Sequence, residues 1–420
     1  MCDLGARDYL LTTILAVVSR LQRISQVSAI MGACLLIHGI ASGQTSISMP
    51  GNLPVARPSK PITAASTTLR QAAQRALLMG SAATADEFSW VSDPLNNPAY
   101  AATLAAQYNM LSPENALKWP IVHPAQSAYN FEPADELVAF AQAHGMRIRG
   151  HNLCWYMDNP DWLTNFAQAA SPFDMYQLLQ KHITTVMSRY QGTIFAWDVV
   201  NEAVSDSATG IGTDLRDSLW YDQPGIGVTG TGYIEQAFRW AHAIDPNALL
   251  FYNDYGIEDS GPKFEAVYNM VQDFVSRGVP IQGVGFQMHI DPTGYPSSAG
   301  LTQNIRRIVA LGLQVHITEM DVRLPVDANG NASAADLQAQ AQTYQRILTV
   351  CLQTPGCTAF QTWEFSDAYS WIPRYFPGYG AALPFDGNYQ PKPAFDAMMT
   401  TLTTAPRRLN NRSSAIGPSY

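Results

Sequence analysis

The 420-residue chain has few charged residues, and basic residues are the scarcer kind. Only 14% of the residues are Asp, Glu, Lys or Arg, and the net charge is −9. No basic stripe is available to neutralise phosphates, so nucleic acid is not expected as a partner. The low charge beside 47% hydrophobic residues is typical of a well-packed globular core and argues against a disordered chain.

The sequence also lacks an apolar run long enough to predict a membrane span. The apolar stretch at residues 27–40 is short and is interrupted by His38 and Gly39. Arginines precede this stretch, and the small residues Ala41-Ser42-Gly43 follow it, which is the order of a secretory signal peptide. We therefore expect residues 1–43 to be a signal peptide and the protein to be secreted, extracellular or periplasmic, with no membrane contact after export.

Cysteine is scarce as well, with five in the chain and no Cys-x-x-Cys pair. Neither cysteine nor histidine spacing indicates a metal site, and no metal or cofactor is expected. Cys351 and Cys357 flank Leu-Gln-Thr-Pro-Gly, a turn that brings them within reach of a disulfide. Cys2 and Cys34 lie in the expected signal peptide, and Cys154 is expected to be a buried free thiol.

Composition divides the chain into three further parts. Residues 44–64, rich in Ser, Pro and Gly, are expected to form a linker or disordered lead, and residues 405–420 a flexible tail. Residues 65–404 form one continuous segment in which eight short apolar runs alternate with helical patterns. This alternation predicts an α/β fold, the parallel (β/α)8 TIM barrel. The expected strands are 77–83, 108–113, 147–153, 195–201, 249–254, 283–289, 314–318 and 358–365, and the expected helices include 133–144, 175–190, 233–244, 264–277, 302–311 and 334–352.

Two glutamates, Glu202 and Glu319, each follow a strand-like apolar run. They are too far apart in the sequence for a local helix or hairpin to join them, but the strand ends of a barrel meet at one face, where active sites assemble. Two carboxylates there suit cleavage of a glycosidic bond: one protonates the leaving oxygen while the other attacks the anomeric carbon or directs water at it. The alternative is two unrelated surface or salt-bridged glutamates.

Seven motifs, in order along the chain, resemble glycoside hydrolase family 10, the endo-β-1,4-xylanases. The resemblance covers about residues 68–402. One such motif alone is weak, because many related barrel glycosidases share it, whereas seven in order are specific. The motifs are ENALKW at 114–119, RGHNLCW at 149–155, WDVVNEA at 197–203, FYNDYGIE at 251–258, QMH at 287–289, ITEMDV at 317–322 and WEFSDAYSW at 363–371.

The resemblance implies a single catalytic domain that degrades xylan and xylo-oligosaccharides with retention of anomeric configuration. Glu319 would be the nucleophile that forms a glycosyl-enzyme, and Glu202 the general acid/base, with the two carboxyls about 5–5.5 Å apart. Burial beside a second carboxylate should raise the pKa of Glu202. His289 is expected to support the ionised Glu319, with Asp321 orienting the histidine.

The remaining residues of the motifs surround this pair. Asn201 is expected to hydrogen-bond the sugar 2-hydroxyl, with a strand-end turn as its structural alternative. For Lys118 the alternative is a helix-face ion pair with Glu114, and for Trp363 it is a place in the core. The resemblance assigns a first group to the glycone side of the cleft, which binds the non-reducing part of the substrate: Glu114, Asn115, Lys118, His151 and Trp155. It assigns Trp363 and Trp371 to the aromatics that cover the sugar at and beyond the cleavage point, and Gln287 also to sugar binding.

Four more motif residues, Asp198, Asn253, Asp254 and Tyr255, are expected to lie behind the sugar-contacting groups. An Asp inside an apolar strand must be paired, and Arg149 or backbone donors are the expected partners of Asp198.

Three positions depart from the family pattern. Tyr156, Glu364 and Ala368 stand where His, Gly and a basic residue are frequent, and all three are expected on loops bordering the cleft. They therefore bear on subsite preference rather than on hydrolysis. A related retaining barrel β-1,4-glucanase or mannanase is the alternative within enzymes. A non-catalytic polysaccharide-binding barrel is the alternative of another class, although both carboxylates are present. Nothing in the sequence requires more than a monomer.

Overall fold

The computed structural model describes residues 67–73, 77–85, 94–211, 214–221, 231–293 and 296–404. The expected signal peptide, linker and tail lie outside the described residues. All described residues belong to one unit, Ala64–Tyr420. None of the helices in this described part is both long enough and apolar enough to cross a membrane.

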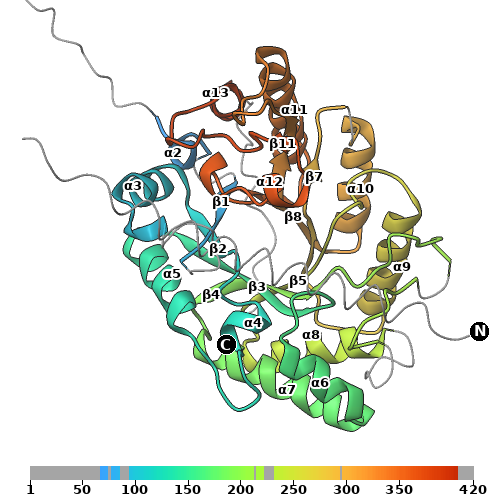
Figure 1. Cartoon of the computed structure of the whole chain (residues 1–420). Helices are drawn as coiled ribbons and strands as arrows, with labels where there is room; N and C mark the ends of the chain where they lie inside the picture. The colour runs from blue at the N-terminus through green and yellow to red at the C-terminus, as the bar shows by residue number, and fades with distance from the viewer. Residues whose placement is uncertain are drawn as a thin grey trace, which may run out of the picture. The chain divides into compact units, whose positions relative to one another are not determined.

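The strands form a closed parallel barrel, which confirms the predicted fold (Figure 1). Neighbouring strands follow the order β10-β1-β2-β3-β4-β5-β6-β8, and β8 pairs with β10 to close the sheet. The strands are β1 (Leu78–Ala83), β2 (Met110–Pro113), β3 (Arg147–Trp155), β4 (Ile194–Asn201), β5 (Leu249–Asp254), β6 (Gly283–Phe286), β8 (Gln314–Val322) and β10 (Cys357–Thr362).

The predicted strand at 283–289 is interrupted in the structure. β6 ends at Phe286, and a two-residue strand, β7 (His289–Ile290), pairs with the end of β8. Between them Met288 has a left-handed backbone with φ 68°, and its N–H donates to the buried Glu258 carboxylate over 2.9 Å. The chain therefore leaves the strand geometry at the point where Gln287 and His289 reach the site.

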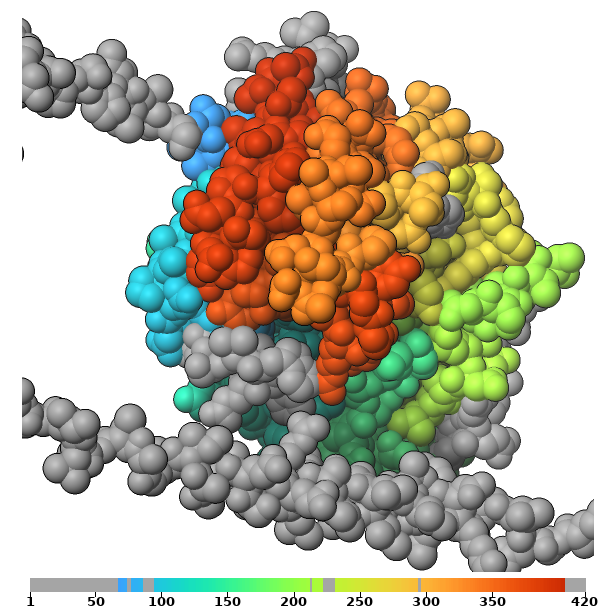
Figure 2. All heavy atoms as spheres, turned by 45° about the horizontal axis from the view of Figure 1, so that its top comes forward, coloured from blue at the N-terminus to red at the C-terminus, as the bar shows by residue number. Residues whose placement is uncertain are grey.

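Helices follow the strands around the barrel, within a few residues of the predicted positions. Side-chain caps set several of their starts: Ser171 and Asp174 form a capping box at α7, and Asn97 caps α3. The first and last described helices pack together, and the blue and red segments accordingly lie side by side in Figure 2. The main helices are α2 (Leu69–Ala73), α3 (Pro98–Gln107), α4 (Trp119–Val122), α5 (Glu132–Ala143), α6 (Asp161–Ala169), α7 (Pro172–Arg189), α8 (Gly232–Ile244), α9 (Pro262–Ser276), α10 (Ser298–Ala310), α11 (Ala334–Gln353), α12 (Ile372–Tyr375) and α13 (Pro393–Thr404).

The strands pack closely because glycines face large rings. A Cβ on Gly150 would lie 2.3 Å from the Trp197 ring, and one on Gly283 would lie 2.1 Å from the Phe251 ring. Such approaches are below any normal carbon–carbon contact, so only glycine fits at these two positions.

Two predictions about cysteine are confirmed. Cys351 and Cys357 form a disulfide that joins the end of α11 to the start of β10. Cys154 is a buried free thiol, and burial raises its pKa, so it is not a reactive thiolate.

Candidate active site

The two glutamates meet at the carboxyl-end face of the barrel, as their positions predict. Glu202 follows β4 and Glu319 lies within β8, and their exposed fractions are 6% and 4%. Glu202 has a left-handed backbone with φ 56°, which is costly for a residue other than glycine, and its N–H donates to the Asn253 carbonyl over 2.8 Å. Such strain is typical of a position that the surrounding structure holds for a function.

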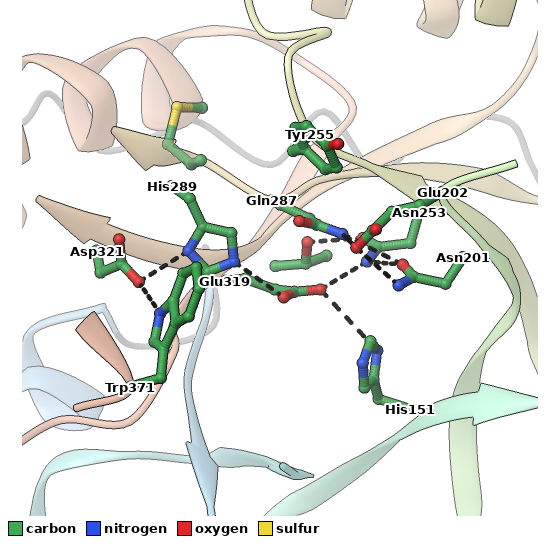
Figure 3. A network of polar contacts seen from close by, with 12 residues as sticks. His151, Asn201, Glu202, Asn253, Tyr255, Gln287, His289, Glu319, Asp321 and Trp371 are labelled. Carbon is green, nitrogen blue, oxygen red and sulfur yellow. Dashed lines mark hydrogen bonds and ion pairs between the residues drawn. The ribbon is translucent and has the colours of Figure 1, made fainter. Parts of the chain in front are cut away.

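Amide side chains connect the two carboxylates (Figure 3). Asn201 Nδ2 and Gln287 Nε2 donate to Glu202 Oε1 over 3.0 and 2.7 Å. Asn253 Nδ2 donates to Asn201 Oδ1 over 2.8 Å and to Glu319 Oε1 over 2.6 Å. A continuous set of hydrogen bonds therefore holds both carboxyl groups in one rigid arrangement, which is the preorganisation that a reacting pair requires.

Glu319 is held as a carboxylate. Burial alone would raise its pKa, but a hydrogen bond from His289 and the nearby His151 and Asn253 outweigh burial and lower the pKa to about 2. His289 Nε2 lies 3.2 Å from Glu319 Oε2, and His289 Nδ1 lies 2.7 Å from Asp321 Oδ2. Burial opposes the charge on His289, but Asp321 and Glu319 raise its pKa to about 10. The expected support of Glu319 by His289 and Asp321 is confirmed as geometry.

Glu202 is shifted in the opposite direction. Burial raises its pKa most, followed by the charge of Asp254 and then that of Glu319, while hydrogen bonds from Gln287 and Trp155 lower it in part. The raised pKa was expected, but the sequence pointed to Glu319 as the neighbouring charge, whereas Asp254 has the larger effect. The pKa values of the two carboxyls are therefore shifted apart, with that of Glu202 raised and that of Glu319 lowered.

The expected sugar-binding residues before α4 lie in a turn. Lys118 Nζ donates to Asn115 Oδ1 over 3.0 Å, pairs with Asp158 at 3.4 Å and lies 5.1 Å from the centre of the Trp155 ring. Since α4 begins only at Trp119, the alternative of a helix-face ion pair between Lys118 and Glu114 is wrong.

Aromatic side chains stand around the carboxylates. Trp155 Nε1 donates to Glu202 Oε2 over 2.9 Å, and Trp371 Nε1 donates to Asp321 Oδ2 over 2.7 Å. Trp371 meets His289 edge to face with ring centres 4.9 Å apart, and Trp363 meets His151 at 5.0 Å. The three tryptophans therefore contact Glu202 itself or residues that surround Glu319. Only 6% of Trp363 is exposed, so most of this side chain is buried, as its structural alternative predicts.

Below the carboxylates the barrel contains an ion pair. Arg149 makes a two-pronged contact with Asp198, as expected, and His151 Nδ1 lies 3.0 Å from the same carboxylate. His151, Asp198 and Glu319 offer possible metal-ligand atoms within 4.8 Å of one another. Because the Arg149 guanidinium already neutralises Asp198, we explain this cluster as an ion-pair network.

Asn253 and Asp254, which were expected to lie behind the sugar-contacting groups, act on the two carboxyls directly. Asn253 contacts Glu319 directly, and the register pairs it with Asn201 on the neighbouring strand. Asp254 is fully buried and pairs with Lys263 of α9 at 3.0 Å. The sequence did contain a signal for the roles of Asn253 and Asp254, because an Asn-Asp pair stands at the end of β5, next to the end of β4.

The three departures from the family pattern have different surroundings. Tyr156 stacks on the Arg216 guanidinium at 4.3 Å, and Ala368 is exposed in the short helix η2 (Asp367–Tyr369). Glu364 follows β10 as expected, but its side chain is only 1% exposed and is hydrogen-bonded to Tyr100 of α3. The expectation that Glu364 borders the open cleft is therefore wrong for its side chain.

A (β/α)8 barrel with a linked, oppositely shifted pair of carboxyls at its strand ends is the arrangement of a barrel glycoside hydrolase. The sequence profile of Glycosyl hydrolase family 10 matches residues 68–401. The chain belongs to this family.

Named xylanases are similar to this chain in sequence and in structure. The chain is 44% identical over 299 residues to "Endo-1,4-beta-xylanase B" of Thermotoga neapolitana, covering 71% of this chain and 82% of that protein. It is 38% identical to "Beta-1,4-xylanase" of Dictyoglomus thermophilum, covering 72% and 84%. The crystal structure of native xylanase 10B from Thermotoga maritima superimposes with a TM-score of 0.73 at 41% identity, covering 80% of this chain and 98% of that one.

Proposed function

We propose that this protein is a retaining endo-1,4-β-xylanase, which hydrolyses internal β-1,4-xylosidic bonds of xylan and xylo-oligosaccharides. The observation that carries the proposal is the pair of buried carboxyls at the strand ends, Glu202 and Glu319, which amide side chains join by hydrogen bonds. The opposite directions of their pKa shifts agree with the two roles. The named relatives, and a Thermotoga petrophila xylanase solved with xylobiose at 41% identity, support xylan as the substrate class.

In the first step, Glu319 attacks the anomeric carbon and Glu202 protonates the glycosidic oxygen of the leaving chain. Glu319 is ionised because His289, His151 and Asn253 favour its charged form. The C–O bond to the leaving sugar breaks and an ester bond to Glu319 forms. The positive charge on His289 remains beside Asp321, which keeps the imidazole in place while the charge on Glu319 is consumed.

In the second step, Glu202 acts as a base. Formation of the ester removes the negative charge of Glu319, and this charge is one cause of the raised pKa of Glu202. Glu202 therefore ionises more readily in the intermediate and accepts a proton from the attacking water. Water displaces Glu319 from the anomeric carbon, so two inversions give overall retention. The expected carboxyl separation of about 5–5.5 Å is the distance that this double displacement requires.

Asn201 is placed to act on the sugar 2-hydroxyl. Its Nδ2 donates to Glu202 and its Oδ1 accepts from Asn253, so its amide plane is held beside both carboxyls. A hydrogen bond from such a fixed amide strengthens in the transition state, which is how it contributes to rate. Trp363 and Trp371 limit the space over the same sugar, which favours xylose over a sugar with a hydroxymethyl group.

The test is a substrate panel with purified protein. Reducing-sugar release from xylan should greatly exceed release from carboxymethylcellulose and mannan, and NMR of xylo-oligosaccharide hydrolysis should show the β-anomer first. Faster cleavage of cellulose or mannan would identify a β-1,4-glucanase or mannanase instead. Binding of xylan without any hydrolysis would identify a non-catalytic barrel.

We also propose secretion as a monomer after removal of residues 1–43. The disulfide between Cys351 and Cys357 supports export, because such bonds persist in oxidising compartments. N-terminal sequencing of the protein from the periplasm or culture medium, together with size-exclusion chromatography with light scattering, tests both statements. An intact N-terminus or a larger assembly would contradict them.

A further inference from the structure

Glu364 is a carboxylic acid in an unusual position. It follows Trp363 directly after β10, its side chain is only 1% exposed, and its backbone is left-handed with φ 66°. Glycine adopts this conformation without cost, and glycine is the residue that the family resemblance leads one to expect here. A residue with a side chain is strained on such a backbone, and burial of its carboxyl is a further cost. Contacts of the side chain must offset this cost.

Tyr100 supplies the main contact. Its hydroxyl lies 3.0 Å from both Glu364 carboxyl oxygens. Tyr100 is itself fully buried in α3 and packs against Phe365 at 4.7 Å and Tyr369 at 5.1 Å between ring centres. The residue pair therefore joins α3 to the segment that carries Trp363, across 264 positions of sequence. Aromatic rings that pack together in this way hold the Glu364 carboxyl in one orientation.

The adjacent strands place Glu114 beside this pair. β1 pairs with β10 on one side and β2 on the other, with Ser81 opposite Thr362 and Ala83 opposite Pro113. Glu114 follows Pro113, and its N–H donates to the Ala83 carbonyl over 2.9 Å. The carboxyl ends of β10 and β2 therefore lie on either side of the end of β1. Glu364 follows the first of these strands and Glu114 the second.

We propose that Glu364, together with Tyr100, is a positioning residue for Glu114 and Trp363 on the side of the cleft that binds the non-reducing part of the substrate. Glu364 does not contact the sugar, because only 1% of it is exposed. The inference rests on the proposed function, since Glu114 and Trp363 are assigned to sugar binding through the family.

Glu364 and Glu114 can lie near each other only if one of the two carboxyls is neutral. Burial first, and then the charge of Glu114, raise the pKa of Glu364 well above its ordinary value, and the hydrogen bond from Tyr100 offsets this only in part. Among the residues that the structure describes, the titratable groups that interact with Glu364 are Glu114 after β2, Tyr100 of α3, Tyr108 after α3 and Tyr369 of η2, which are acids and phenols. Glu364 therefore favours its protonated form, which leaves the negative charge of the two acids on Glu114, the residue that the proposed function assigns to binding sugar hydroxyls.

This arrangement predicts that loss of Glu364 has different effects on KM and on kcat. Loss of the Glu364 side chain should displace Glu114 and Trp363 and weaken substrate binding, whereas Glu202 and Glu319 are positioned by other strands. KM should therefore rise while kcat changes little. Ionisation of Glu364 at alkaline pH should have the same effect, because two carboxylates would then repel each other.

The experiment compares Glu364→Gln, Glu364→Ala and Tyr100→Phe with the control Glu132→Gln, an exposed acid on α5. The substrate is 4-nitrophenyl β-xylobioside, whose two sugars lie on the side of the cleft in question. We expect Glu364→Ala to raise KM at least about 10-fold and to change kcat by less than about 3-fold. A change in KM of this size corresponds to the loss of one hydrogen bond between a sugar hydroxyl and the Glu114 carboxylate. Glu364→Gln, a neutral group of the same shape, should restore most of the affinity.

A pH series provides a second readout. KM of the wild-type protein should rise at alkaline pH, and KM of Glu364→Gln should stay flat over the same range. The proposal is overturned if Glu364→Ala lowers only the melting temperature and leaves KM unchanged, or if Gln and Ala variants lose equal affinity. If Glu364→Ala does not fold, Tyr100→Phe and the pH series decide between the same outcomes. Wild-type protein without xylanase activity would instead refute the proposed function itself.

Discussion

His289 and Glu319 form an ion pair in the mouth of the barrel, with His289 Nε2 3.2 Å from Glu319 Oε2. Asp321 lies 2.7 Å from the other ring nitrogen and also accepts the indole N–H of Trp371. Burial opposes the charge on His289, but Asp321 and then Glu319 raise its pKa to about 10. Burial likewise opposes the charge on Glu319, but His289 and its other neighbours lower its pKa to about 2. The catalytic carboxylate is thus charged because its neighbours hold a cation against it.

This pair should stabilise the fold in a defined pH window. The pKa of His289 is higher in the folded protein, so its contribution is complete below about pH 6.5 and is lost as the pH rises through about 10. The pKa of Glu319 is lower in the folded protein, so its contribution is complete above about pH 4.5 and is lost as the pH falls through about 2. Both contributions are therefore complete between about pH 4.5 and 6.5.

Replacement of His289 by Asn should lower the free energy of unfolding by about 3 kcal/mol at pH 5.5, because the variant leaves Glu319 buried without its cation. The difference from wild type should shrink when urea unfolding is repeated near pH 10. The control His144→Asn, at an exposed position directly after α5, should show no such loss. A destabilisation by His289→Asn that is equal at both pH values would contradict the charge-based account.

Asp254 should set the alkaline limit of activity through Glu202. Its charge is the second cause, after burial, of the raised pKa of Glu202. Asp254→Asn removes that charge, which lowers the pKa of Glu202, while Lys263 keeps its second partner, Asp206, at 2.8 Å. The alkaline limb of the kcat/KM profile should move to lower pH, while the remote Asp396→Asn on α13 leaves it in place. A shift to higher pH would show that Asp254 does not act on Glu202 as a charge.

Azide should distinguish the roles of the two glutamates. Glu319→Ala should lose at least about 10⁴-fold in kcat, because no covalent intermediate can form. Added azide should then enter from the vacated face and give an α-xylobiosyl azide by a single inversion. Glu202→Ala should still form the intermediate from an activated aryl xylobioside, and azide should give the β-product. NMR of the azides identifies each role, and exchanged anomers would reverse the assignment.

The disulfide should contribute to stability and leave catalysis unaffected. It closes a short loop, with a sequence separation of 6 between Cys351 and Cys357. Loop entropy for such a closure predicts that the double Ala variant loses about 2 kcal/mol. Urea unfolding measures this loss, and kcat and KM at 25 °C should match wild type. A change in KM would mean that the loop between α11 and β10 communicates with the cleft.

The barrel and the catalytic pair were predictable from the sequence because both depend on local signals. Apolar runs mark the strands, and strand-end polar residues such as Glu202 mark the face on which a site assembles. The break between β6 and β7 was not predictable, because it depends on Met288 bonding to Glu258, a contact between separate segments. The contact of Tyr100 with Glu364 likewise joins residues with no local relation. Charge effects of buried groups such as Asp254 become visible only when the packing around them is known.

The central claim is that Glu319 forms the glycosyl-enzyme while Glu202 acts as acid and base. A 2-deoxy-2-fluoro-β-xylobioside with a good leaving group tests it most directly, because the fluorine slows hydrolysis of the ester and lets it accumulate. After proteolysis, mass spectrometry should find the fluorosugar on the peptide that contains Glu319, and unlabelled xylobioside should prevent the labelling. A sugar on the Glu202 peptide, or inactivation without any covalent adduct, would contradict the account.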